Sequence, residues 1–271
     1  MRTPHRQFSN QLKKKRTRSV YYIADTNVWT AVTQGKISCK DLSGEAGARV
    51  LVAPFMIIEL MKSTAKSGTK YFAADQQMFQ CMTKFDILEL TKPFVYRILW
   101  NLPNMGSSGV TPATYKSLLQ MMNVATSFQD FIQRTKAPSS PWKRVLDWHS
   151  IHEGVLDKEL GALEKLADSA SLRSLSGGMS KLYRFGGLFP DPDRIEHEFS
   201  AALEYLRASV IKLRQGANLA KNDRGLYVDF QTFFYLADPQ AVIVSNEGFG
   251  EIVKSPQKNR IITLDEFKKL T

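Results

Sequence analysis

The sequence predicts an α/β protein, with a central, mostly parallel sheet between two layers of helices and an all-helical insertion. Three observations support this three-layer α/β/α architecture. Short apolar runs without polar alternation, at 49–53 and 241–245, are typical of strands buried on both faces. Segments with helical periodicity follow these runs, as they do in proteins with parallel sheets. Between residues 92 and 220 the strand texture gives way to helical patterns alone.

The size and composition predict a folded protein. The chain has 271 residues, of which 43% are hydrophobic, so it can bury a core and is not a disordered chain. No apolar stretch approaches the roughly 20 residues of a membrane span, so we expect no membrane partner. Cys39 and Cys81 have no metal-type spacing and do not suggest a disulfide framework. They fit a reducing compartment, and we expect a cytoplasmic protein.

The positive charge is concentrated at the start of the chain. The formal net charge is +11, and residues 1–18 carry seven positive charges and no acid. We interpret this segment as a flexible basic arm, which could contact phosphates or could be only a solvated tail. The candidate nucleic-acid-binding residues are Lys13, Lys14, Lys15, Arg16 and Arg18.

The first core segment alternates strands and helices. The expected strands are 19–24, 49–53 and 85–90. The expected helices are 27–33, 54–62 and 70–83. Pro54 suits the first position of a helix, and the alternation of 85–90 predicts a strand nearer the edge of the sheet.

The domain boundaries follow the change of texture. Helical patterns broken by Gly- and Pro-rich loops fill 92–220, which we interpret as the insertion. The strand and helix texture then returns, with expected helices at 228–238, 247–253 and from Leu264, and expected strands at 241–245 and 260–263. The predicted organisation is therefore a basic arm of 1–18, an α/β core of 19–91 and 221–271, and the insertion between the two core segments.

Four acidic residues lie next to predicted strands or helix starts in the core segments. They are Asp25 after the first strand, Glu59 shortly after the second, Asp229 at a helix start, and Glu247 just after the strand of 241–245. Because ligands bind at the carboxyl ends of parallel strands, these side chains can converge there. Clustered carboxylates repel one another unless cations neutralise them, and oxygen ligands favour Mg²⁺ or Mn²⁺.

These motifs resemble those of the PIN-domain ribonucleases. The matching pieces are Asp25-Thr26-Asn27, Pro54-Phe55-Met56-Ile57-Ile58-Glu59-Leu60, Asp229, and Val244-Ser245-Asn246-Glu247-Gly248-Phe249. The spacing between the last two acids suits one helix and one strand, as the family arranges them. The resemblance covers about 19–90 and 221–271, and it includes neither the arm nor the insertion.

The resemblance implies a metal-dependent endoribonuclease. In that family the acids hold Mg²⁺ or Mn²⁺, and the substrate is usually RNA. Carried over, the metal-binding and catalytic roles fall to Asp25, Glu59, Asp229 and Glu247, with Thr26, Asn27 and Asn246 in support. The family more often has Asp where this chain has Glu247, and the longer side chain shifts the oxygens, so Asp223 is a substitute ligand.

Other interpretations stay open. The Glu247 departure and the large insertion are compatible with a PIN-like scaffold that binds RNA or protein without cleaving, and a third interpretation is a structure-specific DNA nuclease. A protein inhibitor and a second copy of the chain are open as partners. Each acid also has a simpler interpretation: a helix cap for Asp25 and Asp229, a surface residue for Glu59, and a helix-dipole partner for Glu247.

Overall fold

The apolar runs of the core form the strands of one sheet. The computed structural model describes residues 20–43, 49–102, 110–147, 171–214, 230–246 and 248–270. The strands are β1 (Tyr21–Ala24), β2 (Arg49–Val52), β3 (Asp86–Ile87), β4 (Ala241–Val244) and β5 (Ile261–Ile262). Ile23, Val52 and Ile243 are fully buried, as expected for strands with helices on both faces.

All five strands are parallel, in the order β3-β2-β1-β4-β5. The short β3 is at an edge, as its alternating pattern predicts. In the register, Ile23 lies opposite Leu51 on one side and Ile243 on the other, and Ala24 lies opposite Val244. The residues that follow β1 and β4 therefore emerge side by side, at the point where the strand order reverses.

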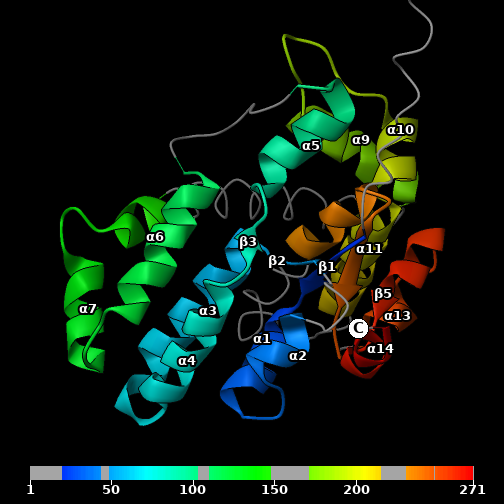
Figure 1. Ribbon diagram of the computed structural model, residues 1–271. Helices are drawn as coiled ribbons and strands as arrows, with labels where there is room; N and C mark the ends of the chain where they lie inside the picture. Colours follow the sequence, from blue (N-terminus) through cyan, green and yellow to red (C-terminus); the bar gives the residue numbers. More distant parts are fainter. Residues whose placement is uncertain are drawn as a thin grey trace, which may run out of the picture.

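Helices surround the sheet and complete the predicted three-layer α/β/α fold. The helices of the core segments are α1 (Thr26–Thr33), α2 (Cys39–Ser43), α3 (Pro54–Ser67), α4 (Phe72–Met82), α13 (Phe249–Ile252) and α14 (Leu264–Leu270). Short 3₁₀ turns are η1 (Gly68–Tyr71), η4 (Tyr235–Ala237) and η5 (Pro256–Arg260), and residues 230–234 are also helical. Figure 1 shows α3 and α4 on one side of the strands and α13 and α14 on the other.

The ends of α3 follow from its sequence. Pro54 occupies its first turn, where a missing backbone N–H costs nothing. The helix runs past the predicted end at Lys62 and stops at Gly68, whose φ of 72° favours glycine. Thr64, in the added part, is buried. The added part of α3 therefore still packs against the interior, although its sequence no longer shows the apolar pattern.

The described part of 92–220 is helical and supplies no strand to the sheet. Its helices are α5 (Thr91–Trp100), α6 (Pro112–Asn123), α7 (Phe128–Lys136), α9 (Leu172–Leu182), α10 (Pro192–Glu198) and α11 (Ser200–Arg214), with residues 141–147 also helical. Their apolar side chains, among them Tyr115 and Phe199, belong to the same hydrophobic core as the sheet. No helix in the described ranges has the length and apolar character that crossing a membrane requires.

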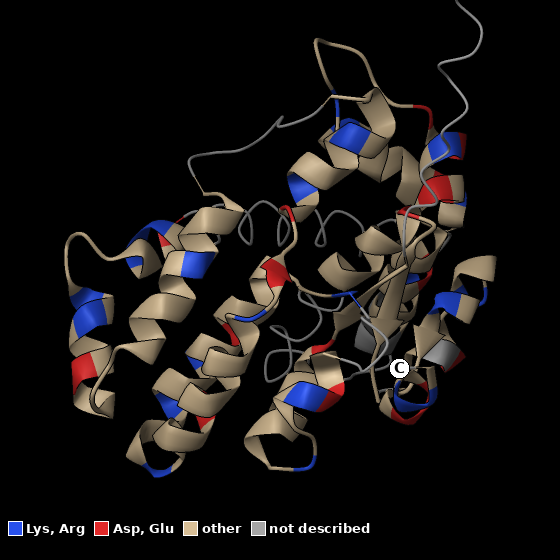
Figure 2. Ribbon diagram, in the orientation of Figure 1, with Lys and Arg blue, Asp and Glu red and all other residues tan. Residues whose placement is uncertain are grey.

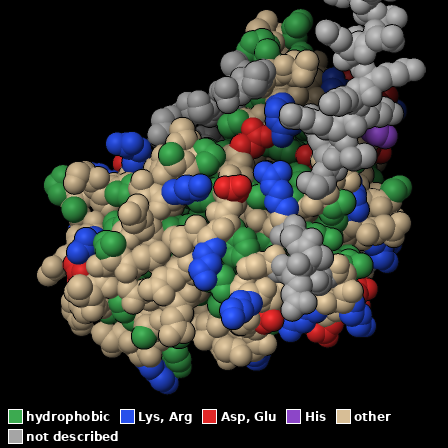
Figure 3. Space-filling model, in the orientation of Figure 1, with side chains coloured by type: hydrophobic (Ala, Val, Ile, Leu, Met, Phe, Trp, Pro, Cys, Tyr) green, Lys and Arg blue, Asp and Glu red, His purple; other side chains and the backbone are tan. Residues whose placement is uncertain are grey.

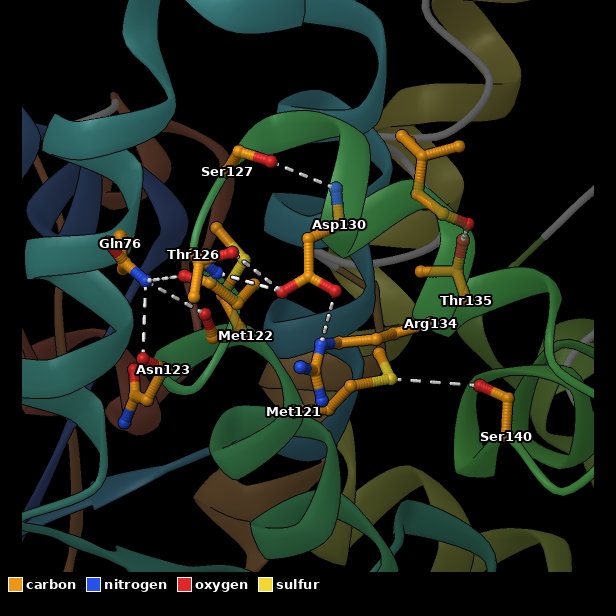
Figure 4. Close-up of polar contacts among 12 residues, drawn as sticks. Gln76, Met121, Met122, Asn123, Thr126, Ser127, Asp130, Arg134, Thr135 and Ser140 are labelled. Carbon is orange, nitrogen blue, oxygen red and sulfur yellow. Dashed lines mark hydrogen bonds and ion pairs between the residues drawn. The ribbon is translucent and has the colours of Figure 1, made fainter.

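Hydrogen bonds from Gln76 connect α4 to the turn between α6 and α7 (Figure 4). The Gln76 side-chain nitrogen donates to the carbonyls of Met122, Asn123 and Ala125, at 3.2, 3.2 and 2.8 Å. These carbonyls lie at the end of α6, where a helix leaves its last carbonyls without partners. One residue of the core thus fixes the direction in which the chain turns towards α7.

Asp130 organises the start of α7 in the same view. Its carboxylate accepts from the Thr126 backbone at 2.8 Å and from the Arg134 Nε at 2.9 Å. These donors hold the pKa of the Asp130 carboxyl below its usual value. The Ser127 hydroxyl in turn accepts from the Asp130 backbone N–H at 3.1 Å, as an N-cap does.

The two cysteines correct a sequence-based expectation. Cys39 and Cys81 form a disulfide, with their Cα atoms 5.5 Å apart, so the described chain has no free cysteine. The sequence spacing does not reveal this pairing, because it depends on the packing of α1 against α4. That packing brings α2 beside the last turn of α4, where Cys81 lies. The bond encloses β2 and most of the α3–α4 hairpin in one covalent loop.

Candidate functional site

Asp25 takes its position from β1 and α1. Its backbone N–H donates to the Val244 carbonyl at 2.9 Å, which continues the pairing of β1 with β4 by one residue. Its side chain then caps α1, because Oδ1 accepts from the Thr26 backbone N–H at 2.7 Å. The simpler interpretation of Asp25 as a helix cap is therefore correct as far as it goes. The residue is only 1% exposed, however, which is rare for a plain cap.

The second oxygen of Asp25 has two donors from different elements. The Asn27 side-chain amide and the Ser245 hydroxyl each donate to Oδ2 at 2.9 Å. The Asn27 amide also lies 3.0 Å from the Ser245 oxygen, which closes a triangle across β1 and β4. Rotation of the carboxylate would break these bonds together. The buried side chain of Asp25 is thereby held in one orientation.

Glu59 reaches the same edge from the second turn of α3. Its Oε2 accepts from the Thr26 hydroxyl at 2.6 Å. Thr26 thus contacts both carboxylates, with its backbone N–H on Asp25 and its hydroxyl on Glu59. The predicted convergence of Asp25 and Glu59 at the carboxyl edge of the sheet is present, and Thr26 is the residue between them.

Asn246 joins the site through Asn27. Its backbone N–H donates to the Asn27 Oδ1 at 3.2 Å. Asn27 therefore contacts Asp25, Ser245 and Asn246 with one side chain. Asn27 and Asn246, both predicted as supporting residues, lie within one hydrogen-bond network with the first acid.

Ser245 is the residue that the sequence reasoning missed. It is 2% exposed and donates directly to Asp25. Ser245 is the first residue after β4, just as Asp25 is the first after β1, but this likeness points to the site only once the pairing of β1 with β4 is known. The parallel register, with Ala24 opposite Val244, places these two residues together.

The remaining predicted site residues lie outside the described part of the chain. They are Asp223, Asp229, Glu247, Lys13, Lys14, Lys15, Arg16 and Arg18. Within the described ranges, no group of three or more His, Cys, Asp or Glu side chains gathers as a metal site would. Two of the four predicted ligands fall outside those ranges, so the four-acid cluster stays a prediction.

A second polar cluster lies at the other end of the strands, around the starts of β1, β4 and β5. The Tyr21 hydroxyl donates to the Asp238 carboxylate at 3.2 Å, and burial and this carboxylate raise the pKa of Tyr21. Arg260 donates to the carbonyls of Asp238 and Ala241, at 2.6 and 3.1 Å, and to that of Leu236. Burial lowers the pKa of Arg260. Since Arg260 binds backbone carbonyls around the start of β4, this cluster holds the fold together.

The charge on the surface shown in Figure 3 is dispersed, with Lys and Arg side chains separated by apolar and neutral ones. No single basic patch covers that face of the described chain. The surface charge therefore does not mark a binding site, and the candidate site is identified by the hydrogen bonds around Asp25.

Comparison with known proteins gives no match to the chain, either from protein-family models, from curated proteins or from solved structures. The assignment of a function rests on the motifs and on the geometry of the site.

Proposed function

We propose that the protein is a metal-dependent endoribonuclease, which hydrolyses RNA phosphodiester bonds. The observation that carries this proposal is the buried carboxylate of Asp25, joined through Thr26 to Glu59. It lies at the carboxyl edge of a parallel sheet, where the strand order reverses between β1 and β4. Ligands bind at such a point in open α/β sheets. The resemblance of the surrounding motifs to PIN-domain ribonucleases supports the same function.

The donor groups at this edge fit a hard divalent cation. Asp25 and Glu59 offer carboxylate oxygens, and hard oxygen ligands select Mg²⁺ or Mn²⁺ over Zn²⁺. Asp25 and Glu59 would hold the ion, and Asp229 and Glu247 are the further ligands that the sequence offers. When bound, such an ion lowers the pKa of a coordinated water and offsets the charge of a phosphodiester.

The chain's own side chains orient the two acids. Asn27 and Ser245 fix the Asp25 carboxylate from one side, and Thr26 fixes Glu59 from the other. Groups that are already oriented need no rearrangement during the reaction, which is the main advantage of an organised active site. Thr26, Asn27 and Ser245 are accordingly positioning residues in this proposal.

A binding scaffold without catalysis is the second candidate. The observation in its favour is that Asp25 acts as the cap of α1 and its Oδ2 already accepts two hydrogen bonds from the protein. A carboxylate with only a structural role would show the same contacts. The two candidates differ in one measurable property, which is metal-dependent cleavage.

The direct test is an RNA cleavage assay on the full chain. We expect mixed-sequence single-stranded RNA to be cut in Mg²⁺ or Mn²⁺ and to stay intact in EDTA. DNA of the same sequence, run in parallel, should be cut far more slowly. Binding of RNA without cleavage under all metal conditions would favour the scaffold, and equal cleavage of DNA would favour a DNA nuclease.

The described chain also carries a short row of lysines on α3 and η1 that begins beside Glu59. Lys62 and Lys66 follow Glu59 by three and seven positions on α3, which places them on a similar face, roughly 4.5 and 10.5 Å along the helix axis. Lys70 follows in η1, next to Tyr71, whose side chain is 50% exposed. Figure 2 shows blue residues along α3 and at its turn into α4, where the basic residues of the sequence are all lysines. Such a row suits a single strand, with cations on phosphates and an aromatic ring for a base.

We expect the double variant Lys66→Ala/Lys70→Ala to weaken RNA binding and to flatten its salt dependence. For a single strand, each phosphate that the protein no longer neutralises changes the slope of log K against log salt by about 0.7, so two phosphates should change it by about 1.4. The measurement is RNA affinity across a salt series, in EDTA so that the RNA stays intact. The matched control is Lys136→Ala/Lys143→Ala, which removes two exposed charges on and after α7. Equal slopes of log K against log salt for the two double variants would show that Lys66 and Lys70 do not contact the RNA phosphates.

A further inference from the structure

Asn246 links the site to the C-terminal helix. Its backbone N–H donates to Asn27 at 3.2 Å, and its side-chain Oδ1 accepts from the Leu264 backbone N–H at 3.1 Å. Leu264 is the first residue of α14. One exposed residue thus connects the network around Asp25 to the start of a helix that carries none of the predicted acids.

The other end of this link has a fixed position. α14 packs through Phe267, which is 1% exposed and lies with its ring 4.9 Å from that of Tyr22. Its first turn is closed by a capping box, in which the Thr263 N–H donates to Glu266 at 2.7 Å and the Glu266 N–H donates to the Thr263 hydroxyl at 3.2 Å. The Leu264 N–H is one of the remaining N-terminal donors of the helix, and Asn246 accepts its hydrogen bond.

The consequence concerns the loop after β4. The Ser245 N–H is held by the Ile262 carbonyl at 2.9 Å, and the next residue is held by Leu264. The same two residues, Ser245 and Asn246, contact Asp25 and Asn27. The loop between β4 and the site is therefore anchored on β5 and α14 while it orients the first acid.

We infer that Asn246 is a positioning residue of the site, and that its side-chain hydrogen bond to the Leu264 N–H, which the Thr263 cap does not form, holds Asn27 and Asp25 in orientation. Its importance for catalysis rests on the proposed function. The geometric coupling from Leu264 to Asn27 does not, because it consists of hydrogen bonds within the protein. Replacing a residue that hydrogen-bonds to a metal ligand typically lowers metal affinity or activity by about 10- to 100-fold.

The test compares two ways of weakening the start of α14. Asn246→Ala removes the acceptor of the Leu264 N–H and frees the loop that holds Asn27. Thr263→Ala removes the cap of the same helix and leaves Asn246 in place, so it is the matched control. Asn246→Asp keeps an acceptor for Leu264 and serves as the conservative variant. The first readout is the Asn27 side-chain amide signal in NMR, with its rate of hydrogen exchange, measured without metal.

We expect Asn246→Ala to broaden or shift the Asn27 amide signal and speed its exchange, whereas Thr263→Ala lowers the melting temperature but leaves the signal unchanged. Asn246→Asp should restore the signal. With Mn²⁺, Asn246→Ala should lose about 10-fold in affinity relative to Thr263→Ala. Equal Asn27 signals in Asn246→Ala and the wild type would overturn the inference. A wild type that neither binds Mn²⁺ nor cleaves RNA would instead overturn the proposed function, and the NMR contrast would still judge the coupling.

Discussion

Replacing Asp25 by Asn is expected to lower metal-dependent RNA cleavage by more than about 100-fold, since even residues that only orient a metal ligand cost 10- to 100-fold. The substitution keeps the size of the side chain and removes its negative charge. It also turns one acceptor into a donor that faces the Asn27 amide or the Thr26 N–H. RNA binding should persist, because it rests mainly on basic residues. The measurement is the single-turnover cleavage rate at saturating protein.

The control for this variant is Ser245→Ala. It removes one of the two donors to Oδ2 and leaves the carboxylate charge, so cleavage should fall by only about 10-fold. Thermal melting of both variants separates loss of the site from loss of the fold. If Asp25→Asn cleaves RNA as fast as the wild-type protein, the catalytic role of Asp25 is wrong.

Reducing the Cys39–Cys81 bond is expected to destabilise the protein by roughly 4 kcal/mol, from the loop-closure entropy of a sequence separation of 42. The loss comes from the unfolded chain, which gains freedom once the loop opens. In the native state, α2 is only five residues long and has one buried side chain, Leu42. The bond to α4 is therefore a main attachment of this short helix.

Urea unfolding with and without a thiol reductant measures the effect. The double variant Cys39→Ala/Cys81→Ala is the control, because its unfolding curve should not respond to the reductant. It should also resemble the reduced wild type in stability, apart from the small change in packing at buried Cys81. Superimposable curves for the oxidised and reduced wild type would show that the bond contributes nothing.

The fold was predictable where local pattern determines structure. The unbroken apolar runs at β1, β2 and β4 and the helical periods between them give the sheet and its covering helices. Asp25, Thr26 and Asn27 could be identified because they are polar and directly follow the apolar run of β1, and residues in that place lie at the carboxyl end of a parallel sheet. Glu59 followed from its place within two turns of β2.

What the sequence did not reveal depends on contacts between distant segments. Ser245 becomes part of the site only through the register of β1 with β4, which no local pattern states. The disulfide depends on the packing of α1 against α4. The hydrogen bonds of Gln76 depend on α6 ending beside α4. The sequence also does not show that the insertion shares one hydrophobic core with the sheet, because the apolar face of a helix does not indicate which element it packs against.

The order of the strands has a consequence for the time course of folding. β1 pairs with β2 nearby in the chain, whereas the hydrogen bond between Asp25 and Ser245 joins residues 220 positions apart. Contacts of high sequence separation form late, since the chain must first close a long loop at an entropic cost. During synthesis the N-terminal half can collapse early, with Thr26 and Asn27 already beside Asp25. The Asp25 carboxylate acquires its partner Ser245 only after β4 has been made. A nascent chain would therefore hold an incomplete site until residues 241–245 have emerged, which would delay the proposed activity until the protein is nearly complete.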